Sequence, residues 1–307
     1  MDIQEKYFLG IDVGGTYVKI GLVKSDGEIV EFHKEDTSLM KLEPEGFNEA
    51  FVKVVGKYLQ KYTQVSHVGI GIPGLISKDR NTTLEIPAIS ELNGFELGHR
   101  LKEQYPSIVF HLENDANAAA VGEFHFGHEK TSGNFLFITL GTGIGSALIM
   151  DGEVFKGVRG NAMEMGHMLS RNNIRLEVLI GRKGIITIMK KKMAEFPDEV
   201  GGLGTEELGM HLLVRTANEG NKVSLEVFKE VGEILGEAIV STVRILDVNE
   251  VYFGGGISAG LPHILPSLEK MVKTNLTPYY TESFSLKRAT LENNAGTLGA
   301  AALCFMD

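Results

Sequence analysis

Two glycine-rich turns are the part of this sequence best suited to hold a chain of phosphates. The first is Gly14-Gly15-Thr16 and the second is Gly141-Thr142-Gly143, and each lies between two apolar, β-type runs that end on an Asp-Gly pair. Asp-Gly is a strong signal for a hairpin turn. Glycine lets backbone N–H groups approach an anion closely, and successive N–H groups form an anion-binding concavity. Either turn alone could be only a turn, but the pair predicts two similar domains that together hold a polyphosphate.

A dinucleotide-binding fingerprint is the competing interpretation of the second turn. The stretch Gly141–Ser146 reads GTGIGS, so the third glycine comes one residue early and Ser146 stands in its place. Residues 147–150 form an apolar strand pattern, whereas the fingerprint requires the start of a helix there. The sequence therefore disfavours a Rossmann-type site.

Asp115 is the candidate general base. It follows a predicted strand at 108–112 and precedes a predicted helix at 116–124. Aspartate in such a place could be only the N-cap of the helix. It could also be a base at the carboxyl end of a strand, where α/β proteins bind their ligands, and accept the proton of an attacking hydroxyl. Asn114 beside it could hold that hydroxyl in line.

Glu164, His167 and Glu177 are polar residues that follow a glycine-containing loop. Glu164 and His167 could bind sugar hydroxyls, cap a turn or bind a metal, but no third or fourth metal ligand is nearby in the sequence. Glu177 begins a predicted helix and could be only a favourable charge in its first turn.

Asp12 and a third glycine cluster are candidates for the nucleotide and its metal. Asp12 ends the first strand among apolar residues, and a buried acid needs a partner. Mg²⁺ brought by ATP would serve as that partner. Gly254-Gly255-Gly256 follows a predicted strand at 251–253, and it could let an adenosine lie against the backbone or merely turn the chain.

Composition narrows the class of protein. The chain has 307 residues, 43% of them hydrophobic, which suits two domains of ordinary size. A net charge of −10 argues against a general nucleic-acid binder. The lone Cys304 excludes an internal disulfide and a cysteine-rich zinc cluster. With no signal-peptide pattern at the N-terminus and no apolar run of ~18 residues, we expect a cytoplasmic protein with no membrane partner.

The elements that must position these residues follow a similar order in the two halves of the chain. Residues 7–32 predict three short strands, and later strands are predicted at 67–72, 108–112, 135–140, 146–150 and 251–253. Helices are predicted at 46–63, 95–104, 116–124, 175–193, 206–218, 224–246, 262–274 and 299–305. The loop at 197–204 is expected to be mobile. We expect a small N-terminal α/β domain, residues 1–116, completed by the C-terminal helix 297–307, and a larger α/β domain, residues 117–296.

Six motifs together resemble the ROK family of repressors, open-reading-frame proteins and sugar kinases. In chain order they are Asp12–Thr16, Glu113–Asn117, Leu140–Gly145, Glu164–His167, Gly254–Ser258 and Ala295–Ala300. The resemblance spans nearly the whole chain. It implies an α/β, actin-like (ribonuclease H-like) ATPase fold, with two similar domains around a central cleft. It also implies transfer of the γ-phosphoryl group of ATP to a hexose, most often glucose or a related hexose at the 6-hydroxyl.

The resemblance also implies roles for individual residues. Asp115 is the implied general base. The implied sugar site consists of Gly74, Asn114, Glu164, His167 and Glu177. The residues implied to face ATP and its Mg²⁺ are Asp12, Gly14, Gly15, Thr16, Lys19, Gly141, Thr142, Gly143, Gly255 and Gly256. Members of the family usually form dimers or tetramers, so we expect a homodimer or homotetramer.

Two stretches depart from the family pattern. The zinc-binding cysteine stretch that usually follows the Glu-x-Gly-His motif is absent from residues 168–177, which read MLSRNNIRLE, so we expect no structural zinc. The loop at 87–92 lacks the asparagine that many members place on a sugar hydroxyl. An N-acetylmannosamine or N-acetylglucosamine kinase and a non-catalytic sugar-binding regulator are the alternatives. Because the first motif starts at Asp12, we expect no DNA-binding domain before it.

Overall fold

The computed structural model describes residues 6–204 and 206–305, and they form two compact units. One unit holds the described residues up to Gly133, then Ala147–Met163 and those from Thr290 onward; the other holds Asn134–Ser146 and Glu164–Ala289. The predicted domain boundaries at residues 116 and 296 stay a prediction. Among the described residues, no helix is long and apolar enough to cross a bilayer.

The first unit is built on a five-stranded sheet of order β3-β2-β1-β4-β7. The strands are β1 (Tyr7–Val13), β2 (Tyr17–Lys24), β3 (Ile29–Asp36), β4 (His67–Ile72) and β7 (Val109–Asn114). The strands β1, β2 and β3 pair antiparallel, whereas β4 is parallel to both β1 and β7. The register aligns Asp12 with Gly71 and Gly71 with Glu113, so the carboxyl ends of three parallel strands meet at one edge.

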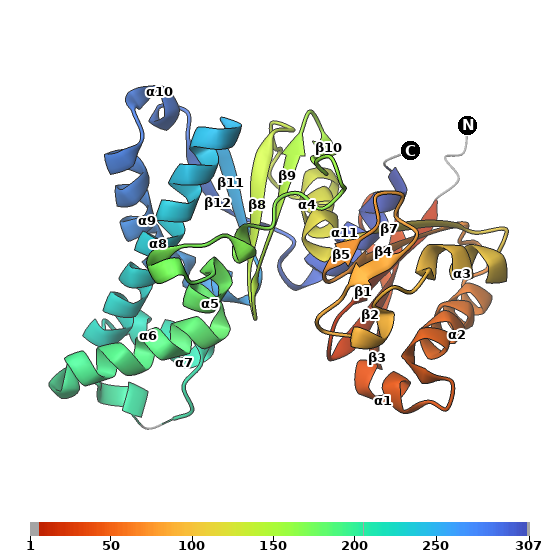
Figure 1. Cartoon of the computed structure of the whole chain (residues 1–307), viewed down its shortest axis with the longest axis horizontal. Coiled ribbons are helices and arrows are strands. Elements are labelled where there is room, and N and C mark those ends of the chain that lie inside the picture. The colour runs from red at the N-terminus through yellow and green to blue at the C-terminus, as the bar shows by residue number, and fades with distance from the viewer. Residues whose placement is uncertain (1–5, 205, 306–307) are drawn as a thin grey trace. The chain divides into compact units, whose positions relative to one another are not determined.

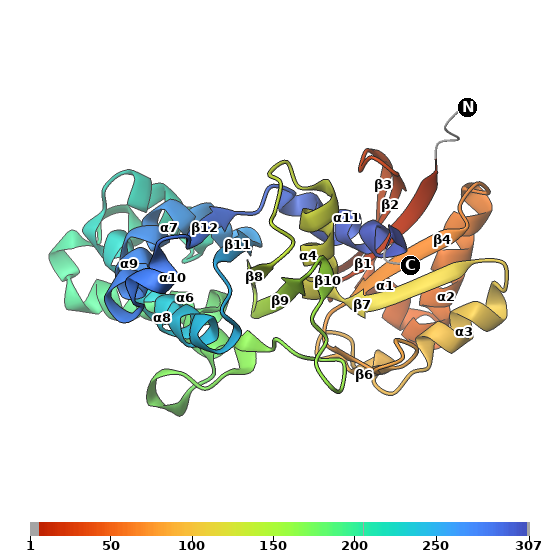
Figure 2. The ribbon, with the colours of Figure 1, turned by 90° about the horizontal axis from the view of Figure 1, so that it is seen from above.

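Helices cover both faces of this sheet (Figures 1 and 2). They are α1 (Thr37–Leu42), α2 (Gly46–Lys61), α3 (Leu97–Gln104), α4 (Asp115–Phe126) and α11 (Ala295–Ala302). Leu9 and Ile11 of β1 share a core with Phe47 and Phe51 of α2, whereas the alternate residue Phe8 packs with residues of α11. This alternation follows from the two-residue period of a strand. A short hairpin, β5 (Leu75–Ile76) with β6 (Thr83–Glu85), follows β4.

The second sheet repeats the order of the first. Its order is β10-β9-β8-β11-β12, with β11 parallel to β8 and to β12. The strands are β8 (Phe135–Leu140), β9 (Ile144–Met150), β10 (Glu153–Val154), β11 (Glu250–Gly254) and β12 (Ser285–Arg288). Two sheets of one topology confirm the predicted duplication and, with it, the actin-like α/β fold class.

The second unit is mostly helical. Its helices are α5 (Leu176–Ile180), α6 (Arg182–Glu195), α7 (Met210–Asn218), α8 (Lys222–Leu246), α9 (Leu261–Asn275) and α10 (Pro278–Thr281). The single helix predicted at 175–193 is wrong, because Gly181, with an extended backbone, ends α5 and begins α6. The loop at 197–204 contains two 3₁₀ turns with Leu203 fully buried, and its mobility stays a prediction.

Candidate active site

The candidate base lies where β7 passes into α4. Asn114 is the N-cap of α4, and its Oδ1 accepts hydrogen bonds from the N–H groups of Ala116 (2.9 Å) and Asn117 (3.1 Å). The interpretation of Asp115 as the N-cap is therefore wrong. Asp115 is the first residue of α4, half-buried, and its Oδ1 accepts a hydrogen bond of 2.9 Å from the Ala116 N–H. The helix N-terminus favours a negative charge at this position.

Gly74 is joined directly to this cap. The Asn114 Nδ2 donates to the Gly74 carbonyl at 3.1 Å, which links the loop after β4 to the end of β7. Gly74 has φ of +117°, and an added Cβ would lie 2.2 Å from the Glu85 carbonyl oxygen. The structure therefore brings together Gly74, Asn114 and Asp115, three of the predicted site residues.

Glu113 anchors the loops next to Asp115, a role that the sequence analysis missed. Its side chain is only 4% exposed, and Arg80 binds it through two contacts, at 3.1 Å from Nε and 3.0 Å from Nη2. Lys156 contributes a third contact at 3.3 Å. Arg80 also donates to the carbonyls of Ser77 and Gly160. The Glu113 carboxylate thus ties two loops to the end of β7.

The first glycine turn lies between β1 and β2. The Gly14 N–H donates to the Tyr17 carbonyl at 3.0 Å, and a Cβ at Gly14 would lie 2.9 Å from that oxygen. Gly15 and Thr16 are exposed at the tip of the turn. Asp12 and Lys19 face each other across β1 and β2, and Lys19 Nζ lies 2.9 Å from Asp12 Oδ2. The acid that was predicted to need a partner is therefore paired with a lysine.

Asp12 suits a magnesium ion that arrives with a nucleotide. Mg²⁺ in such sites usually has one or two protein carboxylates and takes its other ligands from water and phosphate. The Asp12 side chain is 17% exposed and lies next to the glycine turn. No group of three or more His, Cys, Asp or Glu side chains able to hold a metal occurs among the residues that the structure describes.

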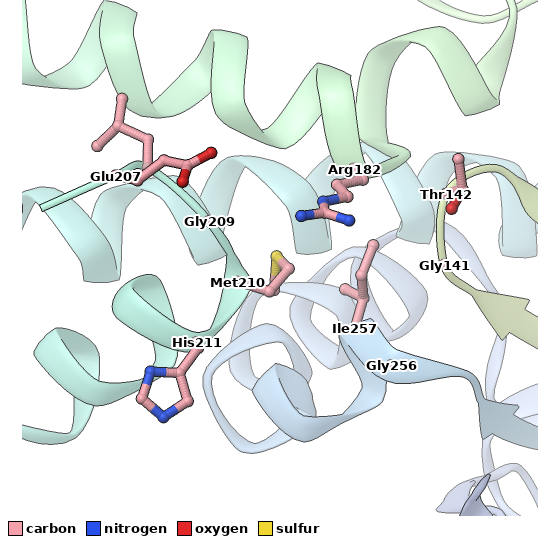
Figure 3. A pocket seen from close by; sticks show the side chains of 10 residues that line it. Gly141, Thr142, Arg182, Glu207, Gly209, Met210, His211, Gly256 and Ile257 are labelled. Carbon is pink, nitrogen blue, oxygen red and sulfur yellow. The ribbon is translucent and has the colours of Figure 1, made fainter. Parts of the chain in front are cut away.

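The second glycine turn borders a pocket in the second unit (Figure 3). The pocket has a volume of about 520 Å³ and lies among four separate segments of the chain. Its lining residues are Gly141, Thr142, Arg182, Glu207, Leu208, Gly209, Met210, His211, Gly256 and Ile257. Three residues predicted to bind the nucleotide, Gly141, Thr142 and Gly256, therefore line one cavity. Ile257 belongs to the Gly254–Ser258 motif, whereas the other lining residues were missed because no motif joins them in the sequence.

Gly255 packs against the end of β8, directly before the second glycine turn. It has φ of +82°, and an added Cβ would lie 2.4 Å from the Leu140 carbonyl oxygen. Within the turn, the Gly141 N–H donates to the Gly143 carbonyl at 3.0 Å. The close approach of the two backbones requires glycine at position 255.

Glu164, His167 and Glu177 form one polar cluster. His167 Nε2 lies 3.3 Å from Glu177 Oε1, and His167 Nδ1 lies 3.8 Å from Glu164 Oε2. Burial raises the pKa of the Glu164 carboxyl, and Glu177 adds to this effect, whereas His167 opposes it. A Cβ at Gly143 would lie 2.7 Å from Glu177 Oε2, so the cluster borders the second glycine turn.

A small hairpin connects His167 to Glu177. The Ser170 N–H donates to the Ile174 carbonyl at 2.8 Å, and Asn172 and Asn173 adopt left-handed backbone conformations at its tip. Arg171 binds Glu237 of α8 through its Nε and Nη2 groups. Backbone pairing and this ion pair hold the hairpin.

The two sheets and their glycine turns define an α/β protein with the actin-like ATPase fold. The chain belongs to the ROK family, whose family model matches residues 8–306. A glucokinase of Halalkalibacterium halodurans is 27% identical, over 98% of this chain and 96% of the relative. A xylose repressor of Caldicellulosiruptor bescii is 26% identical, over 97% of this chain and 78% of the relative.

Two solved structures are similar over almost the whole chain. A candidate sugar kinase from Cytophaga hutchinsonii has a TM-score of 0.93 and 39% identity, and the match covers 97% of this chain and 99% of that one. A ROK family glucokinase from Streptomyces griseus, in complex with glucose and AMPPNP, has a TM-score of 0.79 and 25% identity, with 97% and 98% covered.

Proposed function

We propose that this chain transfers the γ-phosphoryl group of ATP to a hexose hydroxyl, the 6-hydroxyl of glucose or a related hexose, with Asp115 as the general base. That the chain is a sugar kinase follows from its family and from relatives named glucokinase and sugar kinase. What we propose beyond this is which sugar accepts the phosphoryl group, which of its hydroxyls reacts, and which residues take part. The observation that carries it is the place of Asp115, the first residue of α4 directly after the carboxyl end of β7, where Asn114 and not Asp115 is the N-cap.

In the proposed reaction, the oxygen of the sugar hydroxyl bonds to the γ-phosphorus of ATP while Asp115 accepts the proton of that hydroxyl. The bond between the γ-phosphorus and the β–γ bridging oxygen breaks, and ADP leaves. A positioned base of this kind contributes about 10²- to 10⁴-fold to a rate. Asn114 has a second amide hydrogen besides the one donated to Gly74, and that hydrogen is suited to orient a hydroxyl oxygen.

Glu164, His167 and Glu177 are proposed to bind the other hydroxyls of the sugar. Carboxylates accept hydrogen bonds from vicinal hydroxyls, and the histidine ring has one donor and one acceptor nitrogen when neutral. The contact of 3.3 Å between His167 and Glu177 would bring two of these side chains together before the sugar binds. Such preorganisation lowers the entropic cost of binding.

The nucleotide is proposed to use both glycine turns and the pocket beside the second turn. Glycine turns offer backbone N–H groups to phosphate oxygens, and the pocket of about 520 Å³ is large enough for an adenosine. Asp12 would hold Mg²⁺, which when bound neutralises phosphate charge. Lys19, paired with Asp12, would add a positive charge next to the first turn.

An N-acetylhexosamine kinase and a non-catalytic regulator are the alternative functions. The repressor relative supports the regulator, whereas the acid at position 115 supports a kinase. The cytoplasmic location, the absence of nucleic-acid and membrane partners, and a dimer or tetramer stay predictions from the sequence.

The test is ADP release from Mg-ATP with a panel of hexoses and N-acetylhexosamines. The proposal expects turnover on glucose or a closely related hexose. Turnover on an N-acetylhexosamine alone would establish the alternative kinase. Sugar binding by the folded protein without turnover on any sugar would support the regulator and contradict the proposal.

A further inference from the structure

Arg182 is fixed at the junction of the pocket and the second glycine turn. It is the first residue of α6, and its backbone N–H donates to the Gly141 carbonyl at 3.1 Å. Figure 3 shows its guanidinium extending into the pocket between Met210 and Thr142. Among the described residues, no side chain or carbonyl accepts a hydrogen bond from this guanidinium, and no carboxylate pairs with it. A positive charge is therefore presented to whatever fills the pocket.

The pocket has different chemistry at its two ends. Arg182 stands with Gly141 and Thr142 at the end formed by the glycine turn and the N-terminus of α6. Glu207 stands at the other end, on the segment that leads into α7 (Figure 3). Met210 and Ile257 provide apolar surface, and Figure 3 shows Met210 between Glu207 and Arg182. A ligand with an anionic end, an apolar middle and hydrogen-bond donors at its far end fits this arrangement.

We propose that Arg182 binds a phosphate of the nucleotide and sets its direction in the pocket, with the phosphates at the glycine turn and the nucleoside toward Glu207. This inference rests on the proposed function, because it takes the ligand of the pocket to be ATP. Guanidinium matches phosphate in geometry and can donate two parallel hydrogen bonds. The Glu207 carboxylate repels phosphate and accepts hydrogen bonds from hydroxyl or amino groups, so it opposes the reverse direction.

The test compares the binding of ADP and adenosine, measured directly by calorimetry without sugar. The variant is Arg182→Gln, which removes the charge and keeps a polar side chain. The matched control is Lys183→Gln, because Lys183 is exposed on the next position of α6 and does not line the pocket. Arg182→Gln is expected to weaken ADP binding about tenfold, as for the loss of a charged hydrogen bond. Adenosine binding is expected to be unchanged, as is ADP binding to Lys183→Gln.

Four other outcomes would overturn the inference or its basis. Equal weakening of ADP by both variants would assign the effect to the general charge of α6, and equal weakening of ADP and adenosine would assign it to pocket shape. ADP binding unaffected by Arg182→Gln would exclude the arginine while leaving the pocket as a nucleotide site. Failure of the unaltered, folded protein to bind ADP or ATP would instead refute the proposed function.

Discussion

Breaking the buried ion pair between Arg80 and Glu113 by replacing one partner is expected to be strongly destabilising for the first unit. The Arg80 side chain is 13% exposed and that of Glu113 is 4% exposed, so water screens their attraction poorly. Removing one partner of a buried pair typically costs about 3 to 5 kcal/mol, because a charge is left buried without compensation. Lys156 would still contact Glu113, so we expect the lower end for Arg80→Met, about 3 kcal/mol of unfolding free energy.

The assay is urea unfolding followed by circular dichroism, since the chain has no tryptophan. Lys156→Met is the matched control: it removes a positive charge from the same carboxylate, but the Lys156 side chain is 42% exposed. For an exposed lysine we expect a loss below about 1 kcal/mol. The double variant Arg80→Met/Glu113→Gln should lose about 2 kcal/mol less unfolding free energy than the sum of the losses of the two single variants. The reason is that neither partner's charge is then left buried alone.

The loss for Arg80→Met corresponds to a fall in melting temperature of about 6 to 12 °C for a unit of this size. Equal, small losses for Arg80→Met and Lys156→Met would refute the reasoning from burial. Strict additivity in the double variant would show that Arg80 and Glu113 do not act as a pair.

Two further predictions concern the second unit. Burial raises the pKa of the Glu164 carboxyl above its ordinary value of 4.5, so the folded protein favours the protonated form. The contribution of Glu164 to the free energy of unfolding is therefore fully present below pH 4.5 and is lost as the pH rises through the raised pKa. Glu164→Gln should therefore raise the melting temperature relative to the unaltered protein more at pH 8 than at pH 5, and an equal difference at both would contradict this. Gly255→Ala should cost about 2 to 3 kcal/mol, because of its φ of +82° and the contact with Leu140. Gly256→Ala, which meets no atom within 4 Å, should stay within about 0.5 kcal/mol, and equal urea midpoints for the two variants would refute the strain argument.

Much of the architecture could be predicted from the sequence, because it depends on local patterns. The apolar runs around the two glycine turns gave the duplicated sheet, and the resemblance to the ROK family is confirmed. The strand at 285–288 was missed because its residues, Ser-Leu-Lys-Arg, are mostly polar and lie at the edge of the sheet. The break at Gly181 was missed because the helical apolar pattern continues on both sides of it.

The site was predicted less completely, because its contacts are not local. The cluster of Glu164, His167 and Glu177 was expected by resemblance, and the structure brings the three side chains together, but their binding of sugar stays a prediction. Whether Asn114 or Asp115 caps α4 depends on hydrogen bonds that the sequence does not specify. Arg182 was missed because its pocket draws on segments far apart in the chain.

The most direct test of the central claim is the kcat of Asp115→Asn on the sugar that the unaltered protein phosphorylates. Asparagine has nearly the same shape but cannot accept the proton, so kcat should fall by at least about a hundredfold. Sugar binding, measured by calorimetry on the same preparation, should largely survive, and so should the melting temperature. A near-normal kcat in a folded Asp115→Asn variant would remove Asp115 from the role of base and contradict the proposed mechanism.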